Sequence, residues 1–147
     1  MTGYLLDTSV ISALAPGKPM PDEGWVHWLR AQADSTYLPC IAIAELEQGI
    51  CKLRRAGGQT RARRLNAWLD GLLADFADRI LSLDAAVSRR VGQIADRAIA
   101  AGKHPGLADV AIAALAEHHK LMLLTQNLRH FQPLGVTCDN PLKSGRA

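Results

Sequence analysis

A short apolar run near the N-terminus, Tyr4-Leu5-Leu6, constrains the fold most strongly, because it stops abruptly at the acidic residue Asp7. A run of this length is typical of a buried strand in a parallel sheet. Open α/β sheets bind their ligands at the carboxyl ends of the strands, so we expect Asp7 to lie at a ligand-binding edge. The alternative, that Asp7, Thr8 or Ser9 only caps the following helix, remains open from this stretch alone.

The rest of the chain alternates between strand and helix patterns. Further strands are predicted at residues 36–39, 79–83, 121–125 and 135–138, with helical segments between them. This alternation predicts an α/β fold with a mostly parallel central sheet flanked by helices. The chain has 147 residues, which suffice for one domain with its own core but not for two ordinary ones. We expect the domain to span residues 4–141 and the tail, residues 142–147, to be disordered.

Two helices in the middle of the chain form a predicted hairpin arm. Ile41–Arg55 has apolar residues at three- and four-residue spacing, and Gly57-Gly58 interrupts it. Thr60 can cap the next helix, so the two helices are expected to pack as an antiparallel hairpin. The other helices are predicted at residues 8–14, 22–33, 84–101, 107–118 and 127–131, with Asp84 as a cap and Gly102 as a stop.

Three carboxylates stand in apolar surroundings. Asp7 ends the first strand, Glu45 lies in the first turns of its helix, and Asp109 is the only charged residue between positions 106 and 116. A lone buried carboxylate costs several kcal/mol, and a helix N-terminus returns only roughly 0.3–1 kcal/mol. Two structural explanations remain open, a solvated helix face for Glu45 and an N-cap for Asp109. Gathered at one sheet edge, the three acids would form an oxygen-rich site for Mg²⁺ or Mn²⁺.

A fourth polar group follows the strand predicted at 121–125. Asn127 comes after Thr125 and Gln126, which places all three at the same edge of the sheet as the acids. Asn127 either caps the following turn or reaches the metal site through its amide or a bound water. A divalent cation in such a site polarises a phosphoryl oxygen and activates water for attack.

Four motifs in this order resemble the PIN domain, and most of all the VapC and FitB type toxins of bacterial toxin–antitoxin modules. They read Leu-Leu-Asp-Thr-Ser-Val-Ile-Ser from Leu5, Ala-Glu-Leu-Glu-Gln-Gly-Ile from Ala44, Ala-Asp-Val-Ala-Ile-Ala-Ala-Leu-Ala from Ala108, and Thr-Gln-Asn-Leu-Arg-His-Phe from Thr125.

The resemblance implies a single PIN-like domain that acts as an endoribonuclease, hydrolysing RNA phosphodiester bonds with Mg²⁺ or Mn²⁺. It also implies a cognate antitoxin and a homodimer. By this resemblance Asp7, Glu45 and Asp109 are the catalytic, metal-binding acids, and Asn127 stands at a fourth catalytic position that is often Asp. Whether one or two metal ions act is left open.

A cluster of basic residues surrounds the Gly57-Gly58 turn, and no acid lies between Glu47 and Asp70. One interpretation is a solvated helical hairpin. The other is an RNA-binding surface that aligns phosphates across the acids, or that meets an acidic segment of the antitoxin. The cluster consists of Lys52, Arg54, Arg55, Arg61, Arg63 and Arg64.

Composition narrows the location and the class of protein. No run is long and apolar enough to cross a membrane, and the N-terminus lacks a signal-peptide pattern. The three cysteines, Cys40, Cys51 and Cys138, are odd in number and form no CxxC pair. This pattern is typical of cysteines that serve as small core residues in a reducing cytoplasm, and a zinc site is not indicated. We therefore expect a cytoplasmic protein.

Other functions remain open or are excluded on motifs. A catalytically inactive PIN-fold interaction module is one alternative, supported mainly by Asn127 at the fourth position. An RNA-processing PIN nuclease without an antitoxin is another. The sequence has no GxGxxG after the first strand and no Walker A lysine loop. Ser9 rather than Asp follows Asp7 by two residues, which argues against a phosphoaspartate phosphatase.

Overall fold

A five-stranded parallel sheet forms the centre of the computed structural model, which describes residues 3–19 and 21–142. The strands are β1 (Tyr4–Leu6), β2 (Thr36–Pro39), β3 (Ile80–Leu81), β4 (Met122–Leu124) and β5 (Cys138–Asp139). All four pairings between neighbouring strands are parallel. The predicted α/β class with a parallel central sheet is therefore confirmed.

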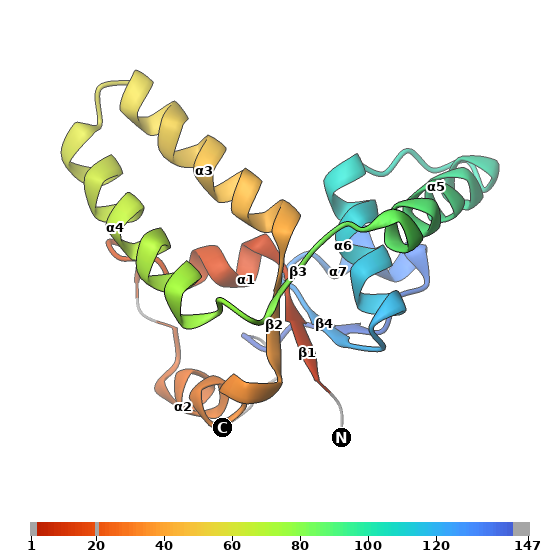
Figure 1. Cartoon of the computed structure of the whole chain (residues 1–147), viewed down its shortest axis with the longest axis horizontal. Helices are drawn as coiled ribbons and strands as arrows, with labels where there is room; N and C mark the ends of the chain where they lie inside the picture. Colours follow the sequence, from red (N-terminus) through yellow and green to blue (C-terminus); the bar gives the residue numbers. More distant parts are fainter. Residues whose placement is uncertain (1–2, 20, 143–147) are drawn as a thin grey trace.

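Seven α-helices connect and cover these strands in the described part of the chain (Figure 1). They are α1 (Thr8–Ala13), α2 (Glu23–Ala31), α3 (Cys40–Arg55), α4 (Gln59–Asp75), α5 (Ala85–Ala100), α6 (Leu107–His118) and α7 (Leu128–Phe131). Two 3₁₀ turns, Ala33–Ser35 and Gln132–Leu134, complete the set. No helix in residues 3–19 and 21–142 is long and apolar enough to span a membrane.

The strand order β3-β2-β1-β4-β5 puts a topological switch point beside β1. The chain adds β2 and β3 on one side of β1, then returns to add β4 and β5 on the other. In open parallel sheets a crevice forms at the carboxyl ends of the strands where the order reverses. Residues that follow β1 and β4 therefore meet at the position where such folds bind their ligands.

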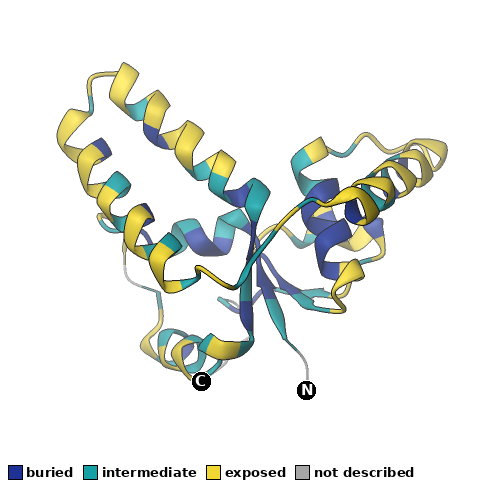
Figure 2. Cartoon of the chain, in the orientation of Figure 1, coloured by how far each residue is buried: buried dark blue, intermediate teal, exposed yellow. Residues whose placement is uncertain are grey.

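The apolar strands fill two cores, one on each face of the sheet (Figure 2). Successive residues of a strand point to opposite faces. Leu5 and Leu123 accordingly pack with α5, α6 and α7, whereas Leu6 and Leu124 pack with α1 and with Trp25 of α2. Burial on both faces explains why these strands are continuous apolar runs.

The α3–α4 hairpin projects away from the sheet as an arm, as predicted (Figure 1). Ile50, Ala62 and Leu69 are buried between its two helices and give the arm a small core of its own. Gly57 lies at φ +95°, a conformation that favours glycine, and so forms the turn. A Cβ at Gly58 would meet the Leu53 side chain at 2.7 Å.

Several element boundaries differ from those predicted. α4 begins at Gln59 with Gly58 as its N-cap, so Thr60 is not the cap. The last strand is Cys138–Asp139 rather than residues 135–138, because Gly135 ends the preceding 3₁₀ turn at φ +79°. Asp84 does cap α5, since its Oδ1 accepts a hydrogen bond from the Val87 N–H at 2.9 Å.

The C-terminal tail is ordered at its beginning. Pro141 is buried, and Leu142 packs partly buried against the core that contains Leu6 and Trp25. The Leu142 N–H donates to Asn140 Oδ1 at 3.1 Å, which fixes the turn. Residues 143–147 of the tail lie outside the described residues, so its disorder stays a prediction.

Candidate active site

Asp7 is the most buried of the predicted site residues and lies at the carboxyl end of β1. It is 3% exposed, and its N–H donates to Leu124 O of β4 at 2.9 Å. Asp7 occupies the N-cap position of α1, but its side chain makes no capping hydrogen bond. Capping therefore does not explain this acid.

The Asp7 carboxylate is held by hydroxyls from two segments. Its Oδ2 accepts hydrogen bonds from Ser9 Oγ at 2.8 Å and from Thr125 Oγ1 at 2.7 Å. Gln126 ties the two segments together, because its N–H donates to Ser9 Oγ and its side-chain Nε2 donates to Ser9 O. Both side-chain bonds reach the same oxygen, and in the described residues Oδ1 accepts no hydrogen bond. Oδ1 is thus the oxygen that remains for a cation.

Asp109 lies in the first turn of α6, close to Asp7. Its side chain is 30% exposed, and its Oδ2 lies 3.3 Å from His130 Nδ1. Gly106 is the N-cap of α6, so the predicted alternative of Asp109 as an N-cap is wrong. Burial and the negative charge of Asp7 raise the pKa of Asp109, while His130 opposes the shift. The two acids therefore repel each other across the edge of the sheet.

Glu45 approaches the same region from α3 but is exposed. Its Oε1 accepts a hydrogen bond from Thr8 Oγ1 at 2.6 Å, which connects α3 to the residue next to Asp7. The sequence reasoning expected an acid in apolar surroundings. Exposure of Glu45 removes that energetic argument, so its inclusion in the site depends on position and on the resemblance.

Asn127 is joined to Asp7 through Thr125. The Asn127 N–H donates to Thr125 Oγ1 at 2.9 Å, and the same hydroxyl donates to Asp7. Asn127 is the N-cap residue of α7, yet its side chain makes no capping hydrogen bond. The exposed amide therefore remains available at the sheet edge for a substrate or a water.

The donor set fits a hard divalent cation in chemistry, although it is not assembled as a ready cluster. Asp7, Glu45 and Asp109 supply carboxylate oxygens, which Mg²⁺ and Mn²⁺ prefer. Burial, and after it the repulsion from Asp7, raise the pKa of Asp109, and a bound cation would counter both effects. In residues 3–19 and 21–142, however, no three His, Cys, Asp or Glu side chains come close enough together to hold a metal ion.

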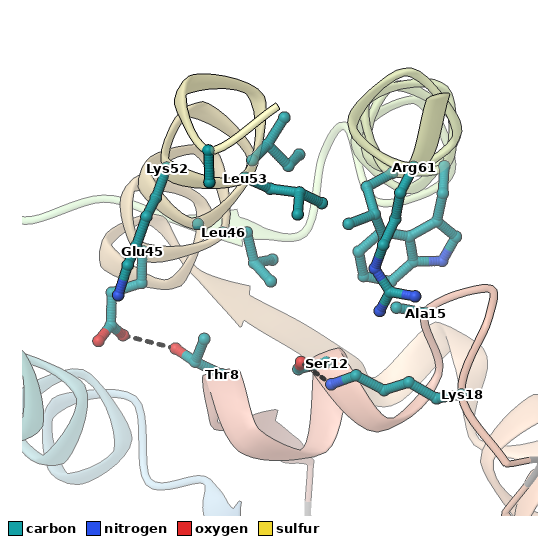
Figure 3. Close-up of a pocket in the computed structure, with 14 residues that line it drawn as sticks. Thr8, Ser12, Ala15, Lys18, Glu45, Leu46, Lys52, Leu53 and Arg61 are labelled. Atoms are coloured by element: carbon teal, nitrogen blue, oxygen red, sulfur yellow. Dashed lines mark hydrogen bonds between the residues drawn. The ribbon is translucent and has the colours of Figure 1, made fainter. Parts of the chain in front are cut away.

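A groove of about 490 Å³ runs from Glu45 along the arm, between α1, α3 and α4 (Figure 3). Its walls are largely apolar, with Leu46, Leu53 and Trp68 among them. Lys52 and Arg61 line it, and Arg61 reaches toward the loop at Gly17. The other four predicted RNA-binding residues are exposed on the arm but do not line this groove: Arg54, Arg55, Arg63 and Arg64.

Sequence reasoning missed the groups that hold the acids. Ser9 and Thr8 follow Asp7 directly, but the sequence shows them only as candidate caps. His130 follows Asn127 in the fourth motif with no signal of its own, yet its ring contacts Asp109. Lys18 lines the groove beside Arg61 from a proline-rich loop that carries no sequence signal for this role.

The raised pKa of Asp109 predicts that the difference in stability between the wild type and Asp109→Asn depends on pH. The folded protein binds this proton more tightly than the unfolded chain, so the free energy of unfolding should fall as the pH rises from about 3.8 through the raised pKa. Asp109→Asn removes the ionisation. Thermal unfolding in EDTA should therefore find the variant more stable than the wild type at neutral pH, with the difference shrinking toward pH 4. Asp96→Asn, an exposed acid of α5, is the control, and an Asp109→Asn effect independent of pH would contradict the prediction.

Comparison with known proteins adds to this geometry. The family model described as "PIN domain" matches residues 4–133. The chain is 35% identical over 138 residues to the VapC ribonuclease Y4jK of Sinorhizobium fredii, and 36% identical over 138 residues to the toxin FitB of Neisseria gonorrhoeae. Each match covers 93% of this chain and 96% of the relative.

A solved structure shows the same fold. The crystal structure of FitAcB from Neisseria gonorrhoeae superposes with a TM-score of 0.81 and 35% sequence identity. The match covers 95% of this chain and 99% of that chain. The likeness therefore includes the sheet and the segments that carry Asp7, Glu45, Asp109 and Asn127.

Proposed function

The chain belongs to the PIN domain family, and on this basis we propose that it is a metal-dependent endoribonuclease that acts as the toxin of a toxin–antitoxin pair. The substrate is RNA, and the reaction is hydrolysis of its phosphodiester bonds. Two relatives support this assignment by name, one as a ribonuclease and one as a toxin.

One observation carries the proposal, namely the buried Asp7 carboxylate beside Asp109 at the switch point of the sheet. Burying one carboxylate next to another costs stability unless a cation or proton compensates. Among residues 3–19 and 21–142 no basic side chain is bonded to Asp7, so a fold that keeps both acids is arranged for an external cation. Catalytic sites commonly keep such destabilising groups because the reaction needs them.

In this proposal Asp7, Glu45 and Asp109 hold the cation. When bound, a divalent cation supplies Lewis acidity toward a phosphoryl oxygen and lowers the pKa of a water ligand. Ser9 and Thr125 keep Asp7 in one orientation through their hydroxyls, and His130 positions Asp109. The Asn127 amide can donate to a phosphate oxygen at the exposed edge.

The basic residues of the arm are proposed to bind phosphates of the RNA. Lys52 and Arg61 line the groove that leads to Glu45, so they are the best placed of the set. Arg54, Arg55, Arg63 and Arg64 extend the positive surface along the arm and attract RNA at longer range.

We also propose a cognate antitoxin as a partner, a homodimer, and a cytoplasmic location. The name of the relative FitB as a toxin supports the antitoxin, and the resemblance alone supports the dimer. Three free cysteines fit a reducing compartment.

A catalytically inactive interaction module is the second candidate. The observation in its favour is that the acids form no ready metal cluster in the described residues, with Glu45 bonded to Thr8 instead. Such a module would need no cation, so metal dependence separates the two candidates.

The test is cleavage of a mixed single-stranded RNA pool by the purified chain. We expect fragments with Mn²⁺ or Mg²⁺, none in EDTA, and recovery when the metal is restored. A DNA pool of the same sequences is the control for RNA as the substrate. Intact RNA at every metal concentration, together with no metal-dependent shift in unfolding temperature, would favour the interaction module.

A further inference from the structure

A second cavity opens beside Asp109, away from the arm. Its volume is about 490 Å³, within the ~300–1,000 Å³ typical of ligand sites. Lys103 and His104 line it from the loop between α5 and α6, and Arg129 and His130 line it from α7. Among the residues that line it, Asp109 is the one acid.

The backbone fixes the two segments that carry these basic groups. Gly102 lies at φ +79°, and the Lys103 N–H donates to Ala98 O at 2.9 Å, so the loop closes tightly onto the end of α5. On the other side, α7 is anchored by Phe131, which is fully buried. The basic side chains are therefore presented by ordered backbone.

Two of these four basic side chains have no carboxylate partner among the described residues. In the described ranges, 3–19 and 21–142, neither Lys103 nor Arg129 forms an ion pair. Asp109, the one carboxylate in the cavity, lies against His130. A cavity lined by cations that no internal acid neutralises attracts anions from solution.

We propose that this cavity binds a backbone phosphate of the RNA strand, on the opposite side of the acids from the arm. The proposal rests on the proposed ribonuclease function. Asp109 lines the cavity and is also within electrostatic reach of Asp7, so a phosphate held here lies next to the catalytic acids. Lys103 and Arg129 offset the repulsion between that phosphate and Asp109.

The two cavities differ in the chemistry of the residues that line them. The groove along the arm is walled mainly by Leu46, Ile50, Leu53 and other apolar groups, whereas four of the residues lining the second cavity carry basic side chains. A strand bound at both would run from the arm past Asp7 and Asp109 to α7 (Figure 1). Contacts on both sides of a reacting bond are what position it for attack.

The experiment measures the salt dependence of binding of a fluorescein-labelled, short single-stranded RNA pool in EDTA. Lys103→Gln/Arg129→Gln should weaken binding and lower the slope of log K against log salt by roughly 0.7, because the loss of one phosphate contact to a single strand removes about that much. Arg30→Gln/Arg89→Gln removes two exposed charges outside the cavity and should leave the slope unchanged. In cleavage assays the cavity variant should lower kcat/KM, because it loses both affinity for the strand and the positioning of the reacting bond.

The outcomes separate this proposal from the function on which it rests. If the wild type neither binds nor cleaves RNA, the ribonuclease and the phosphate site are both wrong. If the wild type cleaves RNA and the cavity variant keeps the wild-type slope, the phosphate site alone is wrong. A variant that keeps the RNA slope but loses affinity for a polyglutamate peptide would assign the cavity to an acidic peptide instead. Circular dichroism checks that each variant folds.

Discussion

Asp7→Asn is expected to reduce RNA cleavage by more than about a hundredfold, because loss of even an outer-shell partner of a metal ligand costs roughly 10–100-fold. Asp7 is proposed as a direct ligand, and it is the most buried of the three acids proposed to hold the cation. The substitution exchanges one carboxylate oxygen for an amide nitrogen. It therefore removes the charge that holds the cation and leaves the size of the side chain unchanged.

The fold should survive this change. The Asn carbonyl oxygen can accept the hydrogen bonds from Ser9 and Thr125 that Asp7 Oδ2 accepts now. Burial is the main cause of the raised pKa of Asp109, and the charge of Asp7 adds to it. The substitution removes that second contribution, so the apo variant should unfold at a temperature no lower than the wild type.

Metal binding provides the matched readout. Mn²⁺ at a hundredfold excess over Kd should raise the free energy of unfolding of the wild type by about 2.7 kcal/mol, and with it the unfolding temperature. Neither should rise in Asp7→Asn. Glu47→Gln, an exposed acid on α3, is the control and should retain both cleavage and the shift. Full cleavage by Asp7→Asn would remove Asp7 from the catalytic site.

Phe131→Ala is expected to have the largest effect on stability, about 3–5 kcal/mol, because it empties a fully buried position in the core under α5 and α6. For a chain of this size the loss corresponds to a fall in unfolding temperature of roughly 10 °C or more. Phe131 also anchors α7, so Arg129 and His130 should lose their fixed positions. Urea unfolding monitored by circular dichroism measures the change.

Phe131→Leu is the matched control. It keeps an apolar side chain in the same place and should cost much less than the alanine variant, because most of the volume stays filled. Similar losses for both variants would mean that the ring makes a specific contribution beyond filling space. A loss below about 1 kcal/mol for alanine would contradict the burial of this residue.

Local sequence signals were enough for much of the fold. α6 begins and ends where predicted, since Pro105-Gly106 opens it and its apolar residues continue to His118. Asp84 is an N-cap and Gly102 a stop for reasons contained within a few neighbouring residues. The start of β5 was predicted too early, because the sequence from Gly135 is compatible with an extended strand. In the structure Gly135 instead ends the preceding 3₁₀ turn.

For the candidate site, the sequence pointed to the acids and to the polar residues that follow β4, but not to the contacts between them. Asp7 and Asp109 are conspicuous because each interrupts an apolar segment, a feature visible in the sequence. The partners of these acids are not conspicuous in the sequence. Thr125 reaches Asp7 only because β4 pairs with β1, and His130 of α7 reaches Asp109 only in the folded chain. Glu45 shows the limit of the argument, because the patterning suggested burial and the structure exposes it.

The hydrogen bond between Thr125 and Asp7 has a consequence for how the protein is made. Its two residues are 118 positions apart, and Thr125 follows the strand that completes the centre of the sheet. A chain still emerging from the ribosome, or one cut short by a premature stop codon, lacks that strand and leaves the Asp7 carboxylate without its Thr125 partner. In the ribonuclease proposed above, this late assembly would delay RNA cleavage until synthesis of the chain is nearly complete.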